Sequence, residues 1–443
     1  MQLRPIKGAE AKQIVPPRGA WPLGDAAAIL ICYLHPNLQA VGTRRFVQLG
    51  EFNLCKRGTI HMASQLFSPI TLAGIELRNR IIVAPMCQYS ADEGVATDWH
   101  LMHLGQYAVS GVGLIITEAV GVEMAGRISP GCLSLCTDAQ EASLKRVVEF
   151  CQTFGNTTMG IQLGHAGRKG STDLPWLGGK PIAAADPRGW ATEAPSATPY
   201  SPDGWETPAA LDEAGMARIK AAFVDAAIRA DRIGFDVAEL HAAHGYLLHQ
   251  FLSPLSNLRS DAYGGSLENR MRFPLEVFDA VAEVWPKHKA LGVRFSATDW
   301  VARSSWDITE STRFAAALKA HGCDFIDVSS AGNSPEQNIE VGPGYQTGFA
   351  AEIRRETGLP TMAVGQITEP HQAEAVIRSG QADMVALARG LPHHPRWAWH
   401  AAEALPAAAP SAPPSLRAHT PPRPRPLPVP HPAPVPPQKH PPA

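Results

Sequence analysis

The sequence predicts an α/β fold, a (β/α)8 TIM barrel with an extension at each end. Short apolar or β-branched segments alternate with longer segments of helical periodicity, which is typical of parallel sheets whose strands are joined by helices. The alternation occurs eight times, the number that closes a barrel. An open doubly wound sheet is the alternative, but no GxGxxG turn follows the first predicted strand.

The predicted strands and helices lie between residues 80 and 404. We place the strands at 80–85, 113–117, 158–162, 235–241, 290–296, 325–329, 360–364 and 384–387. Their helices follow at 99–110, 139–154, 211–233, 270–285, 309–321, 348–357, 370–379 and 395–404. The long connection 164–208 is rich in Gly, Pro and Trp, and such loops at the catalytic end of a barrel are usually lids or substrate-facing insertions.

Both ends of the chain lack this alternation. Residues 1–64 mix Pro, Gly and scattered charges, so we predict a poorly ordered extension, for which an organellar targeting role stays open. The tail 406–443 holds sixteen of the forty prolines, a composition that favours polyproline II or disorder. The predicted organisation is therefore an extension (1–64), a barrel domain (65–405) and a proline-rich disordered tail (406–443).

Composition argues against several classes of function. A net charge of −2 and a pI near 6.8 disfavour nucleic-acid and membrane-surface partners. The longest N-terminal apolar segment, 26–34, is too short to cross a bilayer. Seven cysteines include no CxxC pair, which argues against a structural zinc or iron–sulfur site. A reducing compartment such as the cytoplasm fits best.

The most informative segment is 239–246, which ends and follows the fourth predicted strand. It places His241, His244 and Tyr246 at one strand terminus, and the carboxyl ends of barrel strands are where active sites lie. Imidazoles stabilise a developing oxyanion and a phenol supplies a proton, so the triplet predicts reduction or isomerisation beside a carbonyl. A metal-ligating pair is the alternative, but the spacing is not that of a zinc-protease helix and no carboxylate separates the histidines.

Other strand ends carry groups suited to a cofactor. Gly332 and Gly365 offer backbone amides, and Arg389 adds a cation after the last strand. Barrels commonly hold phosphate at this position. With Gln162 and Arg294 on the third and fifth strands, these residues predict a phosphorylated cofactor across the barrel mouth.

Residues 65–404 resemble the Old Yellow Enzyme family of FMN-dependent ene-reductases, in particular its branch of xenobiotic reductases and thermophilic-like members. The resemblance rests on four segments in the family's order: APMCQY at 84–89, HAGRK at 165–169, ELHAAHGY at 239–246 and SNLRSDAYGGS at 256–266. It implies FMN as the cofactor, NADPH as the hydride donor, and an α,β-unsaturated carbonyl or nitro compound as the substrate. It implies no metal.

The resemblance also implies a role for individual residues. Tyr246 would deliver a proton to the substrate, His241 and His244 would hold the substrate oxygen, and Tyr89 would line the pocket. The FMN phosphate would be held by Gly332, Gly365 and Arg389. The isoalloxazine ring would contact Pro85, Met86, Cys87, Ala119, Gln162 and Arg294.

Some features depart from the family. Its branch normally ends in a short segment that completes the neighbouring subunit's active site, whereas here a proline-rich tail follows residue 405, so a homo-oligomer stays open. An FMN-binding redox sensor or interaction protein with low turnover is the alternative function, suggested by Cys87 and the tail. A dienoyl-CoA-type reductase would need a cysteine run for an iron–sulfur cluster, which the chain lacks.

Overall fold

The computed structural model describes residues 63–405, 407 and 413–417. The predicted N-terminal extension up to residue 62 and most of the predicted tail lie outside the described residues. Within the tail, where we predicted only polyproline II or disorder, a short helix α11 (Pro414–Arg417) forms. It begins with a proline, which the first turn of a helix tolerates because that position needs no N–H donor.

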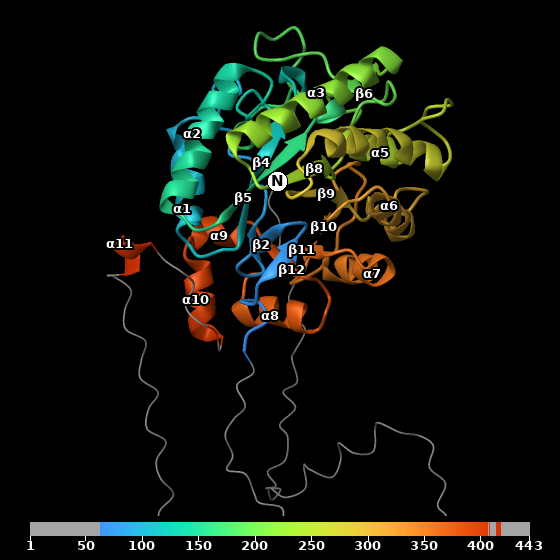
Figure 1. Cartoon of the computed structure of the whole chain (residues 1–443). Helices are drawn as coiled ribbons and strands as arrows, with labels where there is room; N and C mark the ends of the chain where they lie inside the picture. The colour runs from blue at the N-terminus through green and yellow to red at the C-terminus, as the bar shows by residue number, and fades with distance from the viewer. Residues whose placement is uncertain (1–62, 406, 408–412, 418–443) are drawn as a thin grey trace, which may run out of the picture. The chain divides into compact units, whose positions relative to one another are not determined.

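Eight parallel strands close into a barrel, which confirms the predicted fold and excludes the open sheet (Figure 1). The strands pair in chain order, and the last strand pairs with the first. Their side chains are almost entirely buried, because the barrel interior covers one face and the helices cover the other. The strands are β3 (Ile81–Val83), β4 (Leu114–Gly121), β5 (Thr158–Gly164), β8 (Val237–Ala242), β9 (Ala290–Ser296), β10 (Phe325–Ser329), β11 (Thr361–Ala363) and β12 (Met384–Leu387).

A helix follows each strand and packs on the outside of the barrel, so that the helices succeed one another around it in Figure 1. Side-chain caps begin several of them; Thr137, for example, accepts a hydrogen bond from the Gln140 N–H. The outer helices are α1 (Asp98–Ala108), α2 (Asp138–Phe154), α3 (Glu213–Ile233), α5 (Leu267–Val284), α6 (Ile308–Ala320), α7 (Thr347–Thr357), α8 (Pro370–Arg378) and α10 (Trp397–Ala404). All eight lie close to their predicted positions.

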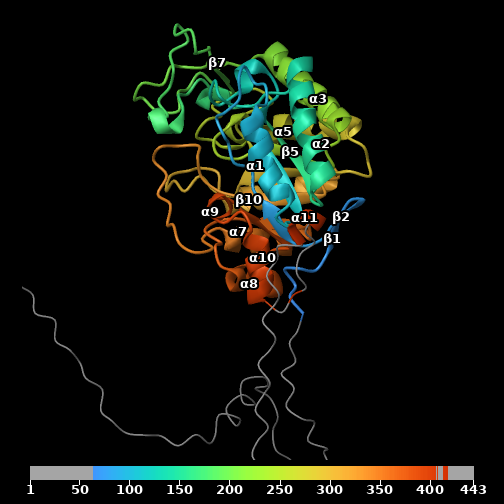
Figure 2. The ribbon, with the colours of Figure 1, turned by 90° about the vertical axis from the view of Figure 1, so that its left-hand side faces the viewer.

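An antiparallel hairpin, β1 (Ile70–Leu72) and β2 (Ile75–Leu77), was not predicted. Leu72 and Leu77 are buried against inward-facing residues of the barrel strands, among them Phe325 and Met384. The hairpin therefore closes the amino-terminal end of the barrel. Figure 2 shows it on the side opposite to the loop that carries β7 (Ala209–Ala210). A candidate active site is therefore expected at the other end of the barrel, where the strands terminate.

Two further differences from the sequence prediction affect that end. Strand β4 continues past the predicted end at Thr117 to Gly121, because an irregularity between Ile116 and Ala119 shifts its register with β5. The connection after β5 contains short 3-10 turns at Gly167–Lys169 and Pro175–Leu177 and a strand β6 (Glu193–Ala194) paired with β7. In the described part of the chain, no helix is both long and apolar enough to span a bilayer.

Candidate active site

The end of strand β8 brings the three predicted catalytic side chains together. His241 lies on the strand, and His244 and Tyr246 follow in the turn before the short helix α4 (Leu247–Leu252). The two imidazole rings meet edge to face with centroids 5.1 Å apart, and His241 Nε2 lies 3.4 Å from His244 Nδ1. The Tyr246 ring packs edge to face on His241 with centroids 5.0 Å apart.

Hydrogen bonds on the outer nitrogens orient both imidazoles. The Ala243 N–H donates to His241 Nδ1 at 3.2 Å, which leaves the ring proton of His241 on Nε2. His244 Nε2 lies 2.7 Å from Ser329 Oγ, and a hydroxyl that donates there leaves the ring proton of His244 on Nδ1. Burial, and then the charge of Arg294, lowers the pKa of both imidazoles well below its ordinary value. When the Ser329 hydroxyl donates to His244 Nε2, two neutral rings direct N–H groups toward one space.

The backbone of the turn is left-handed at two consecutive positions, His244 with φ 59° and Gly245 with φ 74°. A Cβ atom on Gly245 would lie 2.2 Å from the carbonyl oxygen of Gly332, and one on Gly332 would lie 2.5 Å from His244 Cα. Two glycines are therefore needed for this turn and the one after β10 to pack back to back. Gly332 thus supports the catalytic turn, and its N–H donates to Gln337 Oε1 at 2.7 Å.

Lys169 reaches the same turn from the connection after β5. Its Nζ donates to the carbonyl oxygens of His244 at 2.8 Å and Gly332 at 2.6 Å. It also lies 5.2 Å from the Tyr246 ring centroid and 4.7 Å from that of Tyr200. Burial, and then the charge of Arg168, lowers the pKa of Lys169 to about 7. The sequence interpretation gave Lys169 no role, although it ends the HAGRK motif.

The loop after β3 forms a second wall. A hydrogen bond with the Cys132 thiol, together with burial, raises the pKa of the Cys87 thiol well above its ordinary value, so the thiol is neutral. Tyr89 meets Trp176 edge to face, with centroids 5.9 Å apart. The Met86 carbonyl, next to Pro85, accepts a hydrogen bond from Gln88 Nε2 at 2.7 Å. Ala119 shares a crevice of about 10 Å³ with His241 and Tyr246.

The barrel interior beneath these walls holds charged groups. Arg294 Nε lies 3.2 Å from Asp327 Oδ2, and the Gln162 amide donates to Glu239 Oε1 at 2.7 Å. All four side chains are buried. This part of the interior therefore holds two carboxyl groups, on Asp327 and Glu239, and one guanidinium, on Arg294. Burial, and then the nearby Asp327, raises the pKa of Glu239 to about 8, although Arg294 and Gln162 oppose the shift.

A cavity of about 420 Å³ opens beside this interior, between the ends of β9 to β12. Arg294 lines it from the barrel, and Gly365 and Arg389 line it from the rim. Among the described residues, none forms a hydrogen bond or an ion pair with the Arg389 guanidinium. Gly365 has φ 122°, and a Cβ atom there would lie 3.0 Å from Gln346 Nε2 and 3.1 Å from Tyr345 Cε1. The missing side chain keeps this wall of the cavity open.

The predicted site residues thus form two groups, and Arg294 lies between them in the barrel interior. Of the predicted catalytic triplet, His241 and Tyr246 share the crevice with Ala119, and Cys87 and Tyr89 lie close enough to Tyr246 to act on its pKa, whereas Gly365 and Arg389 lie in the cavity. Gly332, predicted beside the phosphate, does not line this cavity, because it packs on the catalytic turn. Gln346 and Tyr345 also line the cavity, but we did not predict them as site residues. Neither directly follows a predicted strand, so no strand end pointed to them.

One further cluster of possible metal ligands lies among the described residues, formed by Glu123, His165 and Glu193. The Arg218 guanidinium pairs with Glu123 and also with Glu193 Oε2, at 2.5 Å from the latter. This guanidinium therefore already pairs with both carboxylates, and His165 Nε2 lies 3.0 Å from Glu123 Oε1. The cluster is therefore explained as an ion-pair network that ties α3 to the loops above β4 and β5.

A parallel barrel with a cation-lined cavity and a His, His and Tyr group at its mouth defines a cofactor-dependent oxidoreductase. The chain belongs to the NADH:flavin oxidoreductase / NADH oxidase family, whose model matches residues 65–408. This result confirms the predicted relation to Old Yellow Enzyme. It establishes an oxidoreductase that uses FMN, with a nicotinamide nucleotide as the hydride donor.

Relatives support this assignment. An NADPH dehydrogenase from Geobacillus thermodenitrificans is 44% identical over 346 residues, covering 78% of this chain and 95% of the relative. The solved structure of morphinone reductase has a TM-score of 0.63 and 31% identity, covering 81% of this chain and 94% of the other. An old yellow enzyme homologue from Zymomonas mobilis has a TM-score of 0.62 and 26% identity, covering 75% of this chain and 91% of the other.

The residues present fit FMN. A cation without another partner binds phosphate strongly, and Arg389, at the edge of a cavity kept open by Gly365, has no hydrogen bond or ion pair with any described residue. Reduced flavin is anionic, and Arg294 places a permanent charge where the cavity meets the barrel interior. The residues that would hold FMN are therefore Arg294 toward the ring, and Gly365 and Arg389 toward the phosphate.

Proposed function

We propose that the protein is an NADPH-dependent ene-reductase that reduces activated alkenes such as enones, maleimides and nitroalkenes. Bound FMN supplies the hydride for the β-carbon of the alkene. The observation that carries the proposal is the convergence of His241 Nε2 and His244 Nδ1, 3.4 Å apart, beside the Tyr246 ring. Two donors and one acid in contact match the charge and proton requirements of conjugate reduction.

The imidazoles hold the substrate oxygen in this proposal. Negative charge grows on a carbonyl or nitro oxygen as the β-carbon is reduced, and two fixed N–H donors stabilise that charge more than the neutral ground state. Because both rings are neutral and already oriented by Ala243 and Ser329, little reorganisation is needed when substrate binds.

Tyr246 delivers the proton to the α-carbon. Burial, and then the nearby Cys87 and Tyr89, raises the pKa of the Tyr246 phenol well above its ordinary value. The phenol therefore keeps its proton at neutral pH, as a general acid must before it reacts. Cys87 serves as a neutral contact to the flavin, since a thiol with a raised pKa is a poor nucleophile and a poor redox sensor.

The test is an anaerobic turnover experiment. FMN-loaded protein should lose its yellow colour with NADPH and regain it when cyclohexenone or a maleimide is added. Reduction by NADPH followed by no recovery with any activated alkene would refute the ene-reductase proposal while leaving the dehydrogenase activity intact.

A further inference from the structure

Side chains hold the backbone of the catalytic turn on every side. The His244 N–H donates to Ser296 Oγ at 2.9 Å, and the His244 carbonyl accepts from Lys169. The Gly245 N–H donates to His249 Nδ1 at 2.9 Å, and the Gly245 carbonyl accepts from Gln250 Nε2 at 2.7 Å. All four polar backbone groups of the two left-handed residues are therefore bonded to side chains.

Such support is needed because the turn is unfavourable by itself. A left-handed conformation is unfavourable for a residue with a Cβ atom, and His244 adopts it directly before Gly245. Conformations of this kind persist only where their surroundings fix them. Any support that fails will let the His244 and Tyr246 side chains move apart from His241.

The support from His249 depends on which ring nitrogen carries the proton. Nδ1 accepts the Gly245 N–H only if the proton is on Nε2. His249 Nε2 lies 3.1 Å from Asp299 Oδ1, both side chains are fully buried, and neither atom has another partner among the described residues. A carboxylate at this distance favours the tautomer with the proton on Nε2.

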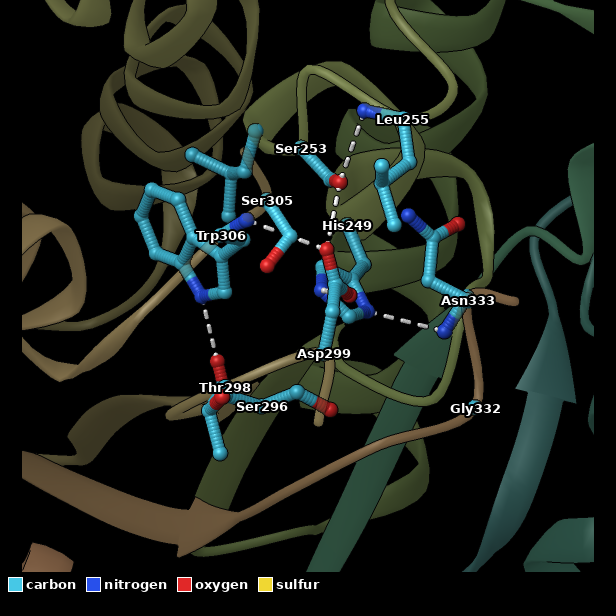
Figure 3. A network of polar contacts seen from close by, with 12 residues as sticks. His249, Ser253, Leu255, Ser296, Thr298, Asp299, Ser305, Trp306, Gly332 and Asn333 are labelled. Atoms are coloured by element: carbon cyan, nitrogen blue, oxygen red, sulfur yellow. Dashed lines mark hydrogen bonds and ion pairs between the residues drawn. The ribbon is translucent and has the colours of Figure 1, made fainter. Parts of the chain in front are cut away.

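Asp299 is itself held in place (Figure 3). Its Oδ2 accepts hydrogen bonds from Ser253 Oγ at 2.6 Å and from the Trp306 N–H at 3.1 Å. Burial alone would raise the pKa of Asp299, but His249, Ser253 and Trp306 together hold it below its usual range. The carboxylate thus stays charged and fixed, and it connects the loop after β9 to helix α4.

We propose that His249 and Asp299 are a positioning pair for the ene-reductase reaction: the Asp299 carboxylate fixes the His249 tautomer, and His249 fixes Gly245 and hence the placement of His244 and Tyr246. Neither residue touches the reacting atoms. The inference rests on the proposed function for its kinetic consequence, but not for the contacts themselves.

Two matched substitutions separate positioning from stability. In His249→Asn, the amide oxygen falls near the position of Nδ1 and can accept the Gly245 N–H, but the side chain no longer reaches Asp299. In His249→Gln, the amide nitrogen falls near the position of Nε2 and reaches Asp299, but Gly245 loses its acceptor. In His249→Asn one oxygen of the buried Asp299 carboxylate loses its donor, which destabilises more than a buried N–H without an acceptor, so the expected order of Tm is wild type, His249→Gln, His249→Asn.

The rates should follow a different order. With FMN-loaded, NADPH-reduced enzyme, we expect cyclohexenone reduction close to the wild-type rate in His249→Asn and about tenfold or more slower in His249→Gln, since misplacement of a reacting group by about 1 Å is costly. Rates that follow the order of Tm would overturn the proposal, because His249 would then act only on stability.

A readout independent of turnover completes the test. Hydrogen exchange of the Gly245 amide in 15N-glycine-labelled enzyme should be slow in the wild type and in His249→Asn, and fast in His249→Gln. Equal exchange in all three proteins would overturn the proposal. If the wild type fails to reduce any enone, the proposed function is refuted, whereas amide exchange still decides whether His249 holds the turn.

Discussion

Strands β8 and β12 end at the same rim of the barrel, but the polar groups that follow them are engaged differently. After β8, four side chains bond the backbone of His244 and Gly245, and Ser329 contacts the His244 ring. After β12, the Arg389 side chain extends beside a cavity of about 420 Å³ and has no polar partner among the described residues. The polar groups of the first region are hydrogen-bonded within the protein, whereas the Arg389 guanidinium in the second region is available to bind a ligand.

The difference follows from what each region must do. Groups that stabilise a transition state act best when they are already fixed, since any reorganisation reduces their effect. Groups that bind a permanent cofactor contribute most when the ligand satisfies them, because a charged donor with no other partner gives the strongest hydrogen bond to phosphate. Substitutions in the two regions should therefore affect different measured quantities.

The largest effect is expected for Tyr246→Phe in the catalytic turn. Losing a general acid typically costs about 10²–10⁴ in rate, so reoxidation of the reduced enzyme by cyclohexenone should slow by that factor. Flavin reduction by NADPH needs no proton from Tyr246 and should stay near the wild-type rate. Stopped-flow measurement of each half-reaction checks this, and an equal loss in both would contradict the proton-donor role.

In the cavity, Arg389→Gln should act on FMN affinity. A charged hydrogen bond contributes about 1.5–3 kcal/mol, which corresponds to roughly 10–10²-fold in Kd. Fluorescence titration of apoprotein with FMN measures this change. A sharper comparison uses riboflavin, which lacks the phosphate. Riboflavin should bind the wild type and Arg389→Gln with the same affinity. An equal loss for riboflavin and FMN would place Arg389 away from the phosphate.

Ser329→Ala tests the orientation of His244. Without the hydroxyl at 2.7 Å, His244 Nε2 loses the partner that leaves its proton on Nδ1. One of the two converging donors is then no longer fixed, and phenol ligands should bind about tenfold more weakly, as expected for a lost hydrogen bond. Absorbance titration with p-hydroxybenzaldehyde measures the affinity, and unchanged binding would show that Ser329 does not set the tautomer.

The last prediction concerns the pH dependence of stability. The pKa of Glu239 is raised to about 8 in the folded state from 4.5, so its contribution to stability is fully present below pH 4.5 and is lost as pH rises through 8. Denaturant unfolding of the FMN-loaded enzyme should therefore give lower stability at pH 8.5 than at pH 5.5. Glu239→Gln should weaken this dependence, and an identical dependence in both proteins would show that Glu239 is not its source.

The sequence was sufficient for the barrel and for the grouping of His241, His244 and Tyr246 at one strand end. The eight strands follow from apolar periodicity, and His241, His244 and Tyr246 lie within six residues, so one strand end brings them together. The hairpin β1–β2 was missed because its two short strands are not each followed by a helix and so do not belong to the strand–helix alternation.

Contacts between distant segments could not be predicted in the same way. Lys169 contacts the turn at His244 only because the chain folds back, and Asp299 likewise reaches His249 from the loop after β9. No local pattern distinguishes these two residues from other buried polar residues. Gly332 illustrates the same limit: a glycine after a late barrel strand suggested a phosphate contact, and its packing against the backbone of His244 and Gly245 had no signal in the sequence.

The most direct test of the account is a crystal structure of the FMN-loaded enzyme with p-hydroxybenzaldehyde. We predict that the phenolic oxygen lies within hydrogen-bond distance of both His241 Nε2 and His244 Nδ1, with FMN in the cavity lined by Arg294, Gly365 and Arg389. A phenolic oxygen bound elsewhere, or imidazoles that turn away from it, would contradict the central claim.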